Sequence, residues 1–215
     1  MRLFRRFFVI ALALILGANA FAGEYFRPGI RAGVSANWIP GTVDSEFQSE
    51  VLPFAGIYAG VSFDTGFTEF PFFWHAELLY ARKGHYDRTE LTSSSYLLDI
   101  SYVEIPVLLG LKMPDGKFSM MFGPEVAYCI AARGVESGRD YKDTADMRGQ
   151  CRPFNFGLGL QANYMITYNF GIDLKVDYGL TKTFTSGNVE MEGHDLTGRG
   201  HNTSVMLGLC YCFGY

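Results

Sequence analysis

The sequence predicts an all-β protein, an eight-stranded antiparallel up-and-down transmembrane β-barrel, on three observations. Segments of roughly ten residues with alternating apolar and polar side chains recur between Pro28 and the C-terminus, and the clearest is 170–180. This period of two indicates strands, because successive side chains point to opposite sides of a sheet. About ten tilted residues cross the apolar layer of an outer membrane. Finally, short turns alternate with long loops, which is typical of transmembrane barrels.

The N-terminal segment 1–22 is predicted to be a cleaved signal peptide that precedes a single barrel domain, 23–215. Arg2, Arg5 and Arg6 form a positive region, an apolar stretch follows to Gly17, and Ala20-Phe21-Ala22 is a small-x-small cleavage site. The apolar stretch is too short for a membrane-spanning helix. We therefore expect export, followed by insertion into the membrane by strands.

The strands follow from the alternation and from the turn chemistry between them. Pro114-Asp115-Gly116 is a turn signal, because Pro presets φ, Asp caps locally and Gly accepts positive φ. Short turns are also expected at 64–67 and 167–169, and long loops at 38–53, 86–95, 132–152 and 181–200. Eight strands place both termini at the short-turn end, in the periplasm. The predicted strands are Pro28–Asn37, Phe54–Phe63, Phe72–His85, Tyr96–Met113, Lys117–Ala131, Pro153–Ile166, Phe170–Leu180 and His201–Phe213.

The composition of the two strand faces favours a membrane barrel over a soluble, lipocalin-like binding barrel. A soluble barrel would present Lys, Glu and Thr on its polar face, whereas here that face is rich in glycine, as small residues in a narrow interior should be. The apolar face carries large aromatic residues towards the strand ends, as in interfacial girdles. Examples are Trp74, Tyr80, Tyr128, Phe156 and Tyr178.

The last strand adds a separate signal. Its alternate residues share one face and finish on a terminal aromatic residue, which looks like the C-terminal signature that outer-membrane assembly machinery recognises. An ordinary lipid-facing strand would explain the first four of them without such a role. The predicted assembly signal consists of Leu207, Leu209, Tyr211, Phe213 and Tyr215.

Short motifs lie at 29–33, 77–84, 102–109, 122–128, 157–159 and 177–180. Together they resemble the PorT-like family of small outer-membrane β-barrel proteins of Bacteroidetes-type bacteria. The resemblance covers nearly the whole mature chain, and the two motifs at 77–84 and 102–109 are its most specific part. It implies an eight-stranded outer-membrane barrel, and a role in protein secretion for only some members.

Charged residues on the inward faces form the most informative candidate site. Isolated charges in so narrow a lumen would cost several kcal/mol each, so we expect these residues to pair. A salt-bridged plug is the favoured interpretation, and a proton or small-ion pathway is the alternative. The predicted lumen charge network consists of Arg31, Glu77, Lys83, Glu104, Lys112, Glu125, Asp173, Lys175 and Asp177, with His75, Asn155, Gln161 and Asn163 as neutral neighbours.

No motif predicts a catalytic, cofactor or metal site. His75 and Glu77 share a face, but the pattern places no Ser beside them and both point away from lipid. Gly157-x-Gly159 lies within a strand with no helix after it, unlike a nucleotide-binding loop. His194 and His201 lie near acidic residues, yet their spacing matches no known ligand set, so a solvated loop is expected.

The four cysteines would meet an oxidising compartment, which permits disulfides. Cys129 and Cys151 face each other across one predicted hairpin with matching inward parity, and we expect either a disulfide or two free thiols there. Cys210 and Cys212 are two residues apart on one strand, a spacing too stretched for an easy bond. They are read as small lumen-filling residues.

We therefore expect a non-enzymatic outer-membrane protein with a structural or interaction role through its outer loops, with a link to secretion as one option. The alternatives are a small barrel enzyme acting on outer-membrane lipid and a soluble binding barrel. Expected partners are outer-membrane lipid and lipopolysaccharide, the assembly machinery, and an envelope or secretion protein. Arg82 and Arg88 are candidates for lipopolysaccharide phosphates. The net charge of −4 gives no reason to expect nucleic acid.

Overall fold

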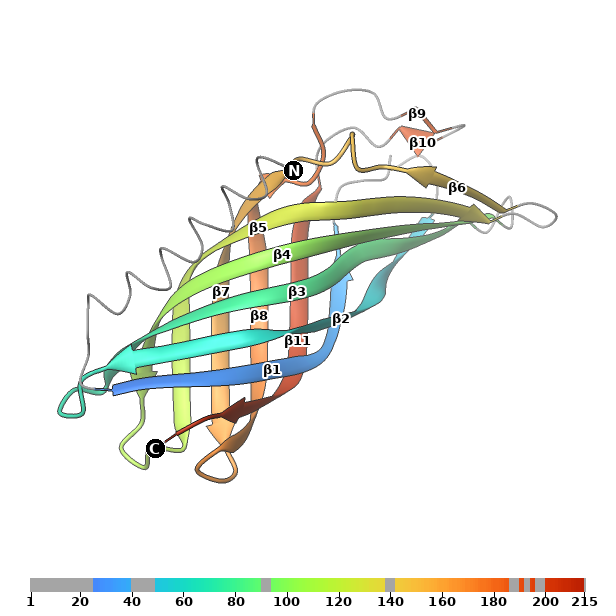
Figure 1. Cartoon of the computed structure of the whole chain (residues 1–215). Coiled ribbons are helices and arrows are strands. Elements are labelled where there is room, and N and C mark those ends of the chain that lie inside the picture. The colour runs from blue at the N-terminus through green and yellow to red at the C-terminus, as the bar shows by residue number, and fades with distance from the viewer. Residues whose placement is uncertain are drawn as a thin grey trace.

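The computed structural model shows a closed antiparallel β-barrel (Figure 1). It describes residues 25–39, 49–89, 94–137, 142–185, 190–191, 194–195 and 200–214. The predicted signal peptide and Tyr215 lie outside these residues. The barrel strands are β1 (Tyr25–Trp38), β2 (Ser49–Gly66), β3 (Phe72–Thr89), β4 (Ser94–Lys112), β5 (Phe118–Ser137), β7 (Phe154–Met165), β8 (Phe170–Lys182) and β11 (His201–Cys212).

Neighbours in sequence are neighbours in the wall, which confirms the predicted up-and-down topology. The sheet order runs β4-β3-β2-β1-β11-β8-β7-β5, and the pairing of β4 with β5 closes the ring. The first and last strands pair from Gly29↔Cys212 to Trp38↔Thr203. Three short strands lie outside this ring: β6 (Lys142–Asp146) pairs with the end of β5, and β9 (Glu190–Met191) pairs with β10 (His194–Asp195).

Short turns gather at the end of the barrel where the C-terminus lies (Figure 1). In the turn after β4, Gly116 adopts a φ of +68° and Asp115 Oδ1 accepts hydrogen bonds from the backbone N–H groups of Lys117 and Phe118. Only glycine takes such a φ without strain, which is why the Pro-Asp-Gly turn is legible in the sequence.

At the opposite end several strands continue beyond their predicted limits. Residues 86–89 and 94–95 extend β3 and β4, and part of the predicted loop 132–152 is the β5–β6 hairpin. Neighbouring strands satisfy each other's backbone groups there, so the chain stays extended. We call residues 82–89, 94–101, 131–137 and 142–146 the outer platform; Figure 1 shows β3 to β6 projecting past the other strands.

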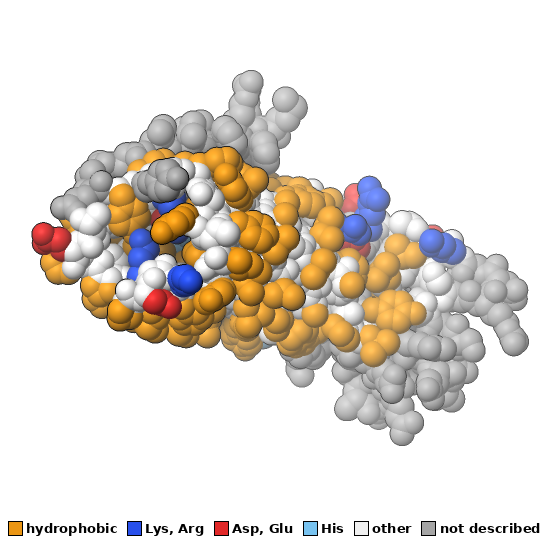
Figure 2. Space-filling view, turned by 90° about the horizontal axis from the view of Figure 1, so that it is seen from below, with side chains coloured by type: hydrophobic (Ala, Val, Ile, Leu, Met, Phe, Trp, Pro, Cys, Tyr) orange, Lys and Arg blue, Asp and Glu red, His pale blue; other side chains and the backbone are white. Residues whose placement is uncertain are grey.

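The outer surface of the wall is hydrophobic, whereas the inner surface carries charged side chains as well as apolar ones. Along β8, Ile172, Leu174 and Val176 are 40%, 48% and 39% exposed, whereas the alternate residues Asp173 and Lys175 are 2% exposed. Figure 2 shows hydrophobic side chains covering the visible flank of the barrel, with charged groups in the open mouth and at the far end. The described residues include no helix long and apolar enough to cross a membrane.

The interior holds four apolar clusters between which the charged side chains lie. The largest closes the end below the outer platform, and we call it the outer core. It contains two residues from the chain after β6, Met147 and Cys151, so part of the predicted long loop 132–152 packs against the barrel interior. Its members are Ile39, Tyr96, Leu98, Ile100, Tyr102, Ala127, Cys129, Ala132, Met147, Cys151 and Phe184.

Candidate functional site: the charged lumen

Arg31 of β1 is the centre of the ion network nearer the short turns. Its Nε lies 3.0 Å from Glu77 Oε1 of β3, and its Nη1 lies 3.5 Å from Asp173 Oδ1 of β8. Nη1 also donates a hydrogen bond to Asn163 Oδ1 (3.2 Å), and the Tyr58 hydroxyl donates one to Asp173 Oδ1 (2.8 Å). Strands from opposite sides of the ring are thus linked through the lumen.

His75 extends this network towards the short-turn mouth. Its Nδ1 lies 2.5 Å from Asp64 Oδ1 and its Nε2 lies 2.8 Å from Glu77 Oε1. Two carboxylates facing both ring nitrogens match the imidazolium, because only that form donates from both. Asp64 also binds Arg27 at 3.0 Å. Neither the predicted turn at 64–67 nor the expectation of a neutral His75 accounts for these ion pairs.

A second network surrounds Lys83 and Lys175 nearer the outer core. Lys83 Nζ lies 2.7 Å from Glu104, 3.2 Å from Asp177 and 3.6 Å from Glu125. Lys175 Nζ lies 2.6 Å from Glu125, 3.3 Å from Asp177 and 3.9 Å from Glu77. Because Glu77 also binds Arg31, Lys175 joins the two networks into one.

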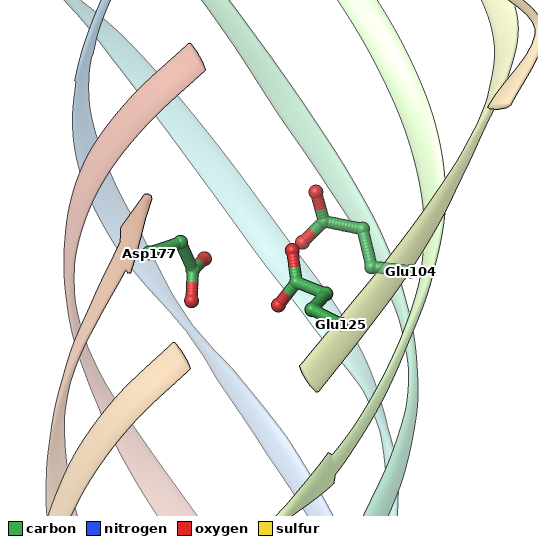
Figure 3. A group of neighbouring side chains, drawn as sticks. All are labelled: Glu104, Glu125 and Asp177. Carbon is green, nitrogen blue, oxygen red and sulfur yellow. The ribbon is translucent and has the colours of Figure 1, made fainter. Parts of the chain in front are cut away.

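The three carboxylates of this second network raise the question of a metal ion. Glu104, Glu125 and Asp177 each offer an oxygen within 4.8 Å of the others (Figure 3), and hard cations prefer such ligands. However, the ammonium of Lys83 lies within ion-pair distance of all three. The lysine therefore occupies the place of the cation, and we assign these carboxylates to the charge network.

Lys112 differs from the other predicted lumen charges. It is only partly buried at the short-turn mouth, where its Nζ donates to the Tyr25 hydroxyl (2.6 Å) and lies 4.2 Å from the centre of that ring. The structure gives it no ion pair among the described residues, so its inclusion in the paired network is wrong. It ends β4 directly before the short turn, where the lumen opens to water.

A cavity lies beside the second network, against the wall. It measures about 310 Å³ including its part open to solvent, and Glu104 and Asp177 line it together with Gly157 and Gly179. Gly157 and Gly179 are the last residues of β7 and β8 that pair with each other. Beyond them the backbone N–H of Phe156 donates a hydrogen bond to the side-chain hydroxyl of Thr181. At the two glycine positions the wall of the cavity carries no side chain.

The remaining predicted residues lie as follows. Leu207, Leu209, Tyr211 and Phe213 of the predicted assembly signal all face outward, with exposed fractions between 42% and 56%.

Arg82 is half-exposed at the outer end and donates two hydrogen bonds to Asp99, of 3.2 and 2.5 Å. The side chains of Arg88 and His194 lie outside the described part of the chain.

All four cysteines are buried and unbonded in the structure. The thiols of Cys129 and Cys151 are in hydrogen-bond contact within the outer core. This proximity agrees with the predicted facing parity, although the covalent bond itself is not formed. The disulfide therefore stays a prediction for protein exposed to an oxidising compartment.

Oxidation of Cys129 and Cys151 is expected to stabilise the barrel by roughly 3 kcal/mol, because the bond closes a loop of about twenty residues. Urea unfolding with and without reductant measures the difference, and the Cys129→Ser/Cys151→Ser variant is the control that should not respond. Mass spectrometry of non-reduced peptides tests the bond directly. Recovery of both peptides separately, each alkylated without reductant, would rule it out.

A continuous lipid-compatible wall around an ion-paired lumen defines the class: a closed transmembrane β-barrel. The family described as outer membrane protein beta-barrel domain matches residues 18–185. The chain therefore belongs to this family of outer-membrane barrels. A search of curated proteins finds no match.

Several solved structures are similar to this chain. A major outer membrane protein from Thermus thermophilus is 16% identical with a TM-score of 0.52, covering 88% of this chain and 100% of that one. Ail of Yersinia pestis is 11% identical (TM-score 0.46; 87% and 98% covered). OprG of Pseudomonas aeruginosa is 18% identical (TM-score 0.44; 90% and 99% covered). At these identities the likeness concerns the fold.

Proposed function

We propose that this protein is a non-conducting outer-membrane barrel whose outer platform contacts another component of the cell envelope. The observation that carries the proposal is the platform itself. Strands β2 to β5 of the wall continue beyond the lipid-facing aromatic residues, and the inward side chains of β4 (Tyr96, Leu98, Ile100) pack with Ala132 of β5 in the outer core. Because loops that merely connect strands need no such packing, a folded extension suits a surface that must keep its shape for binding.

The platform exposes polar and charged side chains. Arg133, Lys142, Asp143, Thr144 and Asp146 are all exposed there, while Val135 is partly buried. Mixed charges of this kind suit a polar partner. They are typical of the polar rim of a transient interface rather than of an obligate interface, which is more apolar. The expected partners are therefore a protein of the envelope, including a secretion component of the kind implied by the PorT-like resemblance, or the sugar and phosphate groups of lipopolysaccharide.

Lipopolysaccharide is the less favoured of these partners. Arg82, the described candidate for its phosphates, already binds Asp99 in a two-hydrogen-bond geometry. Its guanidinium would have to exchange a carboxylate for a phosphate. A non-enzymatic role is supported by His75 and Glu77, because both are buried in ion pairs within the lumen and neither faces lipid.

Site-specific photo-crosslinking in intact cells tests the proposal. A photoreactive residue replaces Thr144 on the platform, and the matched control replaces Tyr168, which is 85% exposed in a short turn at the opposite end. We expect adducts at Thr144 that are absent at Tyr168, and their mass separates protein from glycolipid. Adducts confined to Tyr168, or steady ion conductance of the purified barrel in a planar bilayer, would contradict the proposal.

The platform is expected to lose stability in acid through His85. This residue lies five positions beyond Tyr80 on β3 and is fully buried. Neither of its ring nitrogens has a hydrogen-bond partner among the described residues. The centre of its ring lies 6.1 Å from the centre of the Tyr96 ring. Burial lowers the pKa of His85 to about 4, below the value of about 6.5 in an unfolded chain. The unfolded state therefore binds the proton more readily as pH falls.

The resulting stabilisation is fully present above about pH 6.5 and is lost progressively towards pH 4. Hydrogen exchange of β3 and β4 amides, corrected for intrinsic rates, should show faster opening of the platform at pH 4.5 than at pH 7. The His85→Phe variant supplies a control without the titrating group. Equal pH dependence in the variant and in the original chain would show that His85 is not the cause.

A further inference from the structure

Three sulfur atoms converge at the short-turn end of the lumen, a group that the charge network does not use. Met165 of β7 and Cys210 and Cys212 of β11 form one buried cluster, with exposed fractions of 8%, 1% and 4%. The thiols of Cys210 and Cys212 are in hydrogen-bond contact. Two thiols in contact are near enough to share one metal ion, whose thiolate ligands lie roughly 4 Å apart.

Two of these sulfurs lie directly against the backbone of Gly171. A methyl group on Gly171 would lie 2.9 Å from Met165 Sδ, 3.1 Å from Cys210 Sγ and 2.7 Å from the Tyr164 carbonyl oxygen. Position 171 therefore has no room for a side chain, and its glycine lets the thioether and the thiol approach the same point of the wall.

Cationic groups and an open mouth lie near the cluster. Arg31 acts electrostatically on both thiols, and Arg27 acts on Cys212. The cluster is next to the turn 166–169, whose Asn169 accepts the Cys212 N–H and donates to the Cys212 carbonyl. Figure 2, which looks at the barrel from this side, shows an open mouth with basic groups inside. An ion can thus arrive from the periplasmic side.

We propose that Met165, Cys210 and Cys212 form a binding site for one soft monovalent cation with the chemistry of Cu(I). Thiolate and thioether ligands select such ions over the hard cations that carboxylates bind. On binding, both thiols lose their protons to water, two metal–thiolate bonds form, and the Met165 thioether supplies the third ligand. The resulting complex carries one negative charge, which the guanidinium groups of Arg27 and Arg31 offset.

The same geometry disfavours a disulfide as the resting state of these two cysteines. They are two residues apart on a regular extended strand that pairs on both sides, at Gly29↔Cys212 and Cys210↔Gly171. Side chains at this spacing are close to the upper limit of the Cα separation that a disulfide spans. The pair at the other mouth, Cys129 and Cys151, shares the outer core with the thioether of Met147, so these two thiols must be removed before binding at Cys210 and Cys212 is measured.

Silver ion is the probe, as an air-stable substitute for Cu(I), added to the purified full-length barrel in chloride-free buffer. The Cys129→Ser/Cys151→Ser background removes the outer thiols. We expect the Cys129→Ser/Cys151→Ser protein to bind one Ag(I) per chain and to release two protons, measured in weakly buffered solution. Adding Cys210→Ser or Cys212→Ser should abolish stoichiometric binding, and Met165→Leu should weaken it while both protons are still released.

The heat-dependent gel mobility of each variant shows whether the barrel is folded, so that lost binding is not confused with misfolding. Stoichiometric Ag(I) in the folded Cys210→Ser/Cys212→Ser variant would overturn the proposal. So would a folded background protein that binds none, or mass spectrometry showing Cys210 and Cys212 already joined in protein isolated from cells.

Discussion

Replacing Arg31 by Met is expected to lower the free energy of unfolding by about 3–5 kcal/mol, more than any other single substitution proposed for this chain. Arg31 is 3% exposed and compensates two carboxylates, Glu77 and Asp173, that are equally buried. Methionine fills a similar volume but leaves both charges without their cation. The cost arises mainly from these uncompensated charges and much less from the lost attraction.

Urea unfolding of the barrel in lipid vesicles measures this effect. Arg82→Met is the matched control, because its partner Asp99 is at the outer end and the pair is partly exposed, at 41% and 20%. Such a pair contributes about 0–1 kcal/mol. Adding Glu77→Gln and Asp173→Asn to Arg31→Met should recover part of the loss. Equal costs for Arg31→Met and Arg82→Met would contradict the ion-paired lumen.

Leu174→Arg is expected to cost about 2–4 kcal/mol, because it places a cation on the lipid face near the middle of β8. Leu174 is 48% exposed in the isolated chain and points away from the lumen. Its neighbour Asp173 points inward, and Asp173→Asn should cost less: the amide still accepts from the Tyr58 hydroxyl, and Glu77 still pairs with Arg31.

The same unfolding series in vesicles compares these variants with Thr144→Arg, an exposed platform position on β6 that should change stability by no more than about 0.5 kcal/mol. The expected order of cost is Leu174→Arg, then Asp173→Asn, then Thr144→Arg. A larger cost for Asp173→Asn than for Leu174→Arg would be incompatible with lipid around this strand.

Which residues face inward was predictable from parity alone. All the predicted lumen charges except Lys112 are buried and ion-paired. Their inward orientation follows from parity, because each lies an even number of residues from an inward neighbour on its own strand. Parity does not tell how far along the barrel axis a residue lies. Lys112 has the correct parity but lies at the mouth, where water reaches it and pairing is not required.

Partners across the ring were not predictable, and neither was the role of Asp64. The contacts Arg31–Asp173 and Lys83–Asp177 join residues more than ninety positions apart in the chain. Such contacts depend on the stagger of the closed sheet, which no local pattern encodes. Asp64 precedes a Thr-Gly pair that resembles a turn, yet β2 continues to Gly66 because β1 and β3 pair with it on both sides.

The sequence by itself determined the strand number, the up-and-down order and the two faces of the wall, because a period of two and turn-forming residues are properties of local chain geometry. Only the tertiary structure decided that β3 to β6 rise into a platform with its own core, that Lys83 fills the centre of three carboxylates, and that Met165 meets Cys210 and Cys212. Each of these depends on closure of the ring, which brings together side chains whose separation along the chain carries no information about their distance in space.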